Sequence, residues 1–119
     1  MQDKIFLSSE GYVEIVLIGD QTAQMFEEIY AEFIPLQEEL EAQNKPVLGL
    51  FNLTDETGFS LSSNKAALEI LEKIDYDRVA MYNVPHYNVT DGIIMAAGKS
   101  HNTKLFKTRE EAVNWLLNG

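Results

Sequence analysis

Hydroxyl side chains are concentrated in one short segment of the sequence. Ser60, Ser62 and Ser63 stand just before a run of apolar residues at helical spacing. A serine at a helix start accepts a hydrogen bond from a free backbone amide, which is worth about 1 kcal/mol. A phosphate at the same place would meet those amides and the positive end of the helix dipole, and its charge would repel an acidic partner. The segment therefore predicts a helix cap, either alone or combined with a phosphorylation site that nearby threonines, Thr54 and Thr57, could share.

Histidine offers little catalytic or metal-binding chemistry here. His86 and His101 are the only histidines, and neither has the spacing to other ligands that a metal site needs. Ser62, His86 and Asp55 could be combined into a hydrolytic triad, but no Gly-X-Ser-X-Gly elbow supports it. The sequence 98–100, Gly-Lys-Ser, lacks the glycine spacing and strand context of a phosphate-binding loop. We therefore expect no metal, no cofactor and no enzyme; an enzyme would need His86 beside Ser62 or a carboxylate.

Aromatic side chains form a stripe in the segment 22–44. Phe26, Tyr30 and Phe33 recur at three- and four-residue spacing, together with other apolar residues. Such a stripe is normally a core face. This one is wider than a small domain needs, so it also leaves room for a dimer contact or for an apolar ligand bound by these three aromatics.

Composition and charge limit the possible partners. The chain has 119 residues, no cysteine and a net charge of −10, which indicates one domain, residues 1–119, without disulfides or thiolate metal sites. Residues 1–60 hold two basic residues against twelve acidic ones, whereas residues 61–119 hold seven of each. This acidity disfavours binding to nucleic acid or to anionic membranes. No signal peptide or membrane-spanning run is recognisable, so a cytoplasmic protein is expected.

The basic residues of the second half cluster near the end of the chain. The simplest interpretation is a solvated face that complements the acidic half. The cluster consists of Lys99, His101, Lys104, Lys107 and Arg109.

Hydrophobic periodicity predicts five strands and four helices that position these residues. The strands are expected at 5–7, 12–18, 47–53, 78–82 and 103–106, and the helices at 22–44, 62–74, 86–98 and 108–117. Pro35 should kink the first helix near residues 31–33, or divide it in two. Because helices connect the later strands, we expect a mixed α/β sheet, with an antiparallel opening hairpin and a parallel remainder, in the order ββαβαβαβα.

This pattern, with its acidic proline-containing helix and serine-bearing loop, ends in Phe106-Lys107-Thr108-Arg109-Glu110-Glu111-Ala112-Val113-Asn114-Trp115-Leu116. As a whole it resembles the SpoIIAA-like family, relatives of the STAS domains of sulfate transporters and anti-sigma-factor antagonists. The resemblance implies a small non-enzymatic α/β domain, with a distant likeness to lipid-binding Sec14-type domains.

The resemblance also implies a role for one serine. Anti-sigma-factor antagonists carry an Asp-Ser-Ser-Gly loop whose serine a partner kinase phosphorylates to switch off binding. That loop falls on Leu61-Ser62-Ser63-Asn64, so Ser62 would be the phosphoacceptor, with leucine and asparagine in place of the aspartate and glycine.

Two functional hypotheses follow. The first is a cytosolic, non-catalytic interaction module of STAS type that binds a protein partner, or dimerises, through a loop at 54–65 and the start of the next helix. Its site residues are Asp55, Thr57, Ser60, Ser62 and Ser63. The second is a carrier of a small apolar, lipid-like molecule, with its pocket between the kinked helix 22–44 and the sheet.

Overall fold

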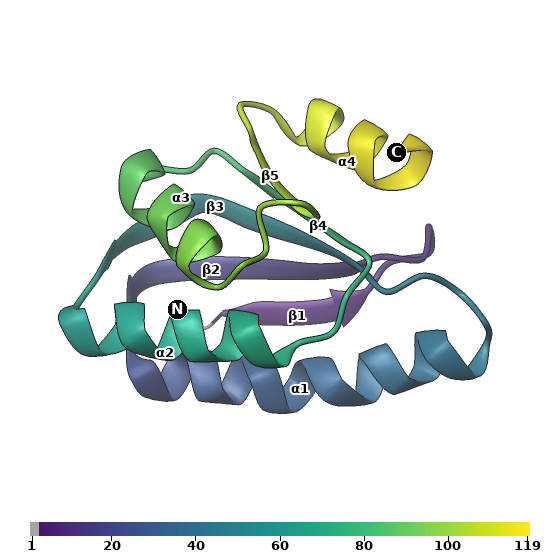
Figure 1. The fold of residues 1–119 in the computed structure, drawn as a ribbon, viewed down its shortest axis with the longest axis horizontal. Helices are drawn as coiled ribbons and strands as arrows, with labels where there is room; N and C mark the ends of the chain where they lie inside the picture. The colour runs from purple at the N-terminus through teal and green to yellow at the C-terminus, as the bar shows by residue number, and fades with distance from the viewer. Residues whose placement is uncertain (1–2) are drawn as a thin grey trace.

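The computed structural model describes residues 3–119, with Phe59 described by its backbone alone. The order of elements is the predicted ββαβαβαβα (Figure 1). The strands are β1 (Lys4–Leu7), β2 (Val13–Gln21), β3 (Leu48–Phe59), β4 (Arg78–Tyr82) and β5 (Thr103–Phe106). The helices are α1 (Ala23–Ala42), α2 (Leu61–Lys73), α3 (Tyr87–Ala96) and α4 (Arg109–Asn118).

The five strands form one mixed sheet in the order β1-β2-β3-β4-β5. β1 pairs antiparallel with β2, and every later pair is parallel, as predicted. Each parallel connection steps to the next strand in the same direction, so right-handed crossovers place their helices on the same face. Figure 1 shows α1, α2 and α3 on that face and α4 on the other.

The central strand β3 separates two apolar cores. Adjacent strand residues point to opposite faces, so Phe51 packs with the larger core under α1, α2 and α3, while Leu50 belongs to a smaller core under α4. The larger core includes Phe33 from α1, and the smaller includes Leu116 from α4. The prediction that this strand is buried on both faces is confirmed.

Helix α1 runs without interruption from Ala23 to Ala42, with Pro35 inside it (Figure 1). Of the two expected outcomes, a kink near residues 31–33 or a division into two helices, the division is therefore wrong, because Pro35 leaves only one carbonyl of the preceding turn without its helical partner. Thr22 caps the start, and Asn44 adopts a left-handed conformation, φ 56°, just past the end. A backbone hydrogen bond from Lys45 to the Leu40 carbonyl completes this C-cap.

Strand β3 is longer than predicted. The polar segment 54–58 was expected to be a loop, but Asp55 to Phe59 continues the ladder with β2, after a bulge that shifts the register. The error arose because β2 itself extends to Gln21, three residues beyond its predicted end, and supplies backbone partners for a polar sequence.

The basic cluster near the C-terminus is largely engaged within the chain. Arg109 forms an ion pair with Glu14 at 2.8 Å and donates to the Tyr12 hydroxyl, which ties the start of α4 to β2. Lys104 lies over the Trp115 ring, and Lys99 donates to the Ile74 carbonyl. These contacts give the cluster a structural role in addition to the predicted solvation.

Candidate functional site

The first turn of α2 is held by two of the three serines. The Ser63 amide donates to Ser60 Oγ at 3.1 Å, and the Ser60 amide donates to Ser63 Oγ at 2.7 Å. This reciprocal capping box satisfies two backbone donors, and Ser63 is completely buried within it. Ser60, and not Ser62, is the N-cap, so α2 begins one residue earlier than predicted.

Ser62 lies on the outside of the same turn. Its side chain is exposed, and its hydroxyl is 3.0 Å from Ser60 Oγ. The preceding residue, Leu61, is 88% exposed, which is unusual for a large apolar side chain. The turn therefore presents the Ser62 hydroxyl and the Leu61 side chain to solvent, while Ser60 and Ser63 cap the helix.

Asp55 and Thr57 lie on the extended part of β3, not in a loop. The Thr57 hydroxyl donates to the Asp20 carboxylate of β2, which links the two strands where they run beyond β4. Thr54 donates to Asn52 Oδ1 at 2.6 Å. These polar side chains support the edge of the sheet beside α2, and the structure does not join them to the serines in a single loop.

The proposed hydrolytic triad is not assembled. His86, at the start of α3, has its Nε2 3.4 Å from the Thr57 carbonyl, while the Ser62 hydroxyl is beside Ser60. His86 lies instead near the carboxyl group of Glu56, which is the pairing of histidine with a carboxylate that the enzyme alternative required. Within residues 3–119 no group of three or more histidine and acidic side chains could hold a metal ion.

Glu56 is a buried carboxyl group, with 4% of its surface exposed. Burial raises its pKa above the ordinary 4.5, while His86 and the Gly58 amide favour the charged form and Asp20 opposes it. Among the residues that the structure describes, its Oε1 finds no hydrogen-bond partner. This burial could not be predicted from the sequence, because a glutamate in a polar segment is normally solvated.

Helices α2 and α3 flank an open groove of about 710 Å³ that begins beside Ser62. Most of the lining side chains are apolar or small, and Lys65 is the only ionisable one. The groove is lined by Leu61, Ser62, Asn64, Lys65, Leu68, Asn88, Val89, Gly92, Ile93 and Ala96.

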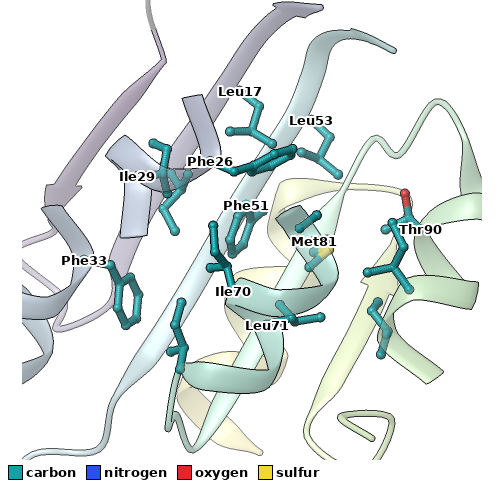
Figure 2. A pocket seen from close by; sticks show the side chains of 15 residues that line it. Leu17, Phe26, Ile29, Phe33, Phe51, Leu53, Ile70, Leu71, Met81 and Thr90 are labelled. Carbon is teal, nitrogen blue, oxygen red and sulfur yellow. The ribbon is translucent and has the colours of Figure 1, made fainter. Parts of the chain in front are cut away.

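A separate apolar cavity lies between the helices and the sheet (Figure 2). Phe26 and Phe33 are among its lining residues, together with strand residues such as Leu53. Tyr30 is not among the lining residues, and its ring lies under the Lys73 ammonium group, 5.9 Å from the ring centre. The cavity measures about 70 Å³, whereas an engineered cavity that admits benzene measures about 150 Å³. It has no room for a lipid chain.

No protein-family model and no curated protein matches the sequence. Among solved structures, an uncharacterised protein of the DUF3478 family from Shewanella loihica PV-4, described as having a SpoIIAA-like fold, matches at 22% identity and a TM-score of 0.62. The match covers 96% of this chain and 91% of that one.

A second solved structure is the anti-sigma factor antagonist SpoIIAA in its unphosphorylated form. It matches at 15% identity and a TM-score of 0.63, over 98% of this chain and 99% of that one. At these identities the matches show the fold, and the chain has the SpoIIAA-like, STAS-type α/β fold that the sequence pattern suggested. In the part of the chain described here, no helix combines the length and apolar character needed to cross a bilayer.

Proposed function

We propose that this chain is a non-catalytic regulatory module of STAS type, which binds a protein partner through the start of α2 and is switched by phosphorylation of Ser62. The supporting observation is that the three serines have different structural roles. Ser60 and Ser63 cap the helix, whereas Ser62 is exposed and free to be modified. Leu61 beside it offers apolar contact area to a partner.

A phosphate on Ser62 is physically compatible with the folded chain. It would lie in the first turn of α2, where backbone amides lack helical partners and the dipole is positive. It would add a charge of about −1.5 to −2 at a surface that a partner must desolvate. Modification is therefore expected to weaken partner binding while leaving α2 folded.

The phosphorylation part is tested by peptide mass spectrometry of the protein purified from its own cells under phosphatase inhibition. The expected result is a phosphate on Ser62 and none on Ser63, whose hydroxyl is buried and committed to the cap. If Ser62 is unmodified in every growth phase, the switch is refuted.

The binding part is tested with two aspartate substitutions at exposed leucines. Leu61→Asp places a charge on the proposed surface, and Leu117→Asp makes the same change on α4, where the leucine is 39% exposed. In affinity purification from the original cells, a partner should be retained by the wild type and by Leu117→Asp but lost with Leu61→Asp. Equal retention by both variants would place the interface elsewhere.

A further inference from the structure

The groove between α2 and α3 contains a glycine that the fold itself does not require. Gly92 is in the middle of α3 and is exposed. It has no left-handed conformation to adopt, and a Cβ built on it would meet nothing within 4 Å. Glycine disfavours a helix relative to alanine. At this position the glycine leaves the side of the groove without a side chain.

The side chains around Gly92 make an apolar channel at the surface. Leu61 is 88% and Val89 45% exposed, and Ala96, one turn after Gly92, is also small. The lining consists of helix side chains and contains no strand edge. An extended peptide would leave its backbone amides without partners there, whereas a helix satisfies its own. A helix is therefore the element that suits the channel.

Positive charge lies at one end of the groove and indicates which group a bound helix would place there. Lys65 is the only ionisable residue in the lining, and the structure pairs it with no acidic side chain in residues 3–119. The first turn of α2, with Leu61 and Ser62, borders the same groove and carries the positive end of the helix dipole. Both features favour a carboxylate on the bound helix. A second copy of this chain fits less well, because each copy carries a net charge of −10.

We propose that the α2–α3 groove binds an amphipathic helix of a partner protein, with a small residue against Gly92 and a carboxylate facing Lys65. This inference rests on the proposed interaction function and specifies its partner. It also gives the Ser62 switch a physical basis, because a phosphate at this end of the groove would repel the partner's carboxylate.

The test uses synthetic helical peptides as probes and the full-length chain. A cross-linked helix of about 15 residues carries leucines at i, i+4 and i+7, a central alanine and one terminal glutamate; its control has glutamine there. Titration into the ¹⁵N-labelled protein should give saturable amide shifts in residues 61–68 and 88–96. The glutamate peptide should bind about threefold more tightly than its control.

Three protein variants make the test specific. Lys65→Gln should remove the preference for glutamate, whereas Lys45→Gln, an equal charge change on an exposed residue outside the groove, should preserve it. Gly92→Ala should weaken both peptides about tenfold by filling the channel. It should also raise the melting temperature by about 4 °C through better helix propensity, so lost binding could not be attributed to unfolding.

Three results would overturn the proposal: no saturable shifts in the groove, equal affinity for the two peptides, or groove shifts that grow with protein concentration alone. Shifts that grow with protein concentration alone would show that a second copy of the chain occupies the groove. A phosphate found on Ser62 without peptide binding would retain the proposed function and reject this inference. Peptide binding together with an unmodified Ser62 would support this inference and reject the phosphorylation switch.

Discussion

At the residue scale, Ser60 and Ser63 form the hydrogen bonds that cap the start of α2. Ser60→Ala removes the acceptor for the Ser63 amide and should lower the free energy of unfolding by about 1 kcal/mol. Ser62→Ala should change it by less than about 0.5 kcal/mol, because Ser62 caps nothing. Urea denaturation of the two variants checks this. A larger loss from Ser62→Ala than from Ser60→Ala would contradict the capping geometry.

The buried carboxyl of Glu56 should make stability depend on pH. Because burial raises its pKa, the folded chain holds this proton more tightly than the unfolded chain does. The contribution of Glu56 to the free energy of unfolding is therefore complete below its ordinary pKa of 4.5, and it is lost as the pH rises through the raised pKa. Glu56→Gln keeps an acceptor for the Gly58 amide and removes the charge.

Glu56→Gln is thus expected to melt at a higher temperature than the wild type at about pH 8 and at nearly the same temperature at about pH 4. Thermal melts monitored by circular dichroism at both pH values make the comparison. A variant less stable at about pH 8 would show that the charged carboxylate has a partner that stabilises it.

At the element scale, α1 tolerates a proline at a cost. Pro35 is exposed, leaves the Ala31 carbonyl without its helical donor and has no packing role in the larger core. Pro35→Ala restores the hydrogen bond and should raise the free energy of unfolding by about 2 kcal/mol, somewhat less than the full helix penalty of proline because the unfolded chain also gains freedom. Urea denaturation measures the change. A loss of stability would mean that the helix depends on the geometry proline imposes.

At the scale of the whole molecule, the interior decides against the carrier hypothesis. The cavity between the helices and the sheet is apolar but measures only about 70 Å³. A native mass spectrum of protein purified gently from its own cells should therefore show the polypeptide, with or without phosphate, and no non-covalent apolar adduct. A denaturing spectrum of the same sample separates covalent from non-covalent mass. A lipid-sized adduct that disappears on denaturation would restore the carrier hypothesis.

The order of elements and the mixed sheet could be predicted from the amino-acid sequence alone. Apolar runs in strands and periodic apolar residues in helices reflect burial patterns that depend on local spacing. For this reason β4 and β5 were predicted with their observed bounds. Asn44 and Gly98, which follow the ends of α1 and α3, both adopt the left-handed conformation, a local preference of asparagine and glycine. The serine segment was predicted as a helix start because serine side chains accept hydrogen bonds from free backbone amides.

Contacts between distant segments determine which serine of that segment is exposed and does not cap the helix. The strand partner of residues 55–59 lies more than thirty positions away in β2, and this pairing turns a polar loop into a strand and buries Glu56. The strand's extension to Phe59 leaves Ser60 as the cap and Ser62 exposed. The groove likewise requires α2 and α3 to pack side by side, so the open space at Gly92 could not be read from local spacing. These features depend on contacts between distant segments, which propensity and periodicity do not encode.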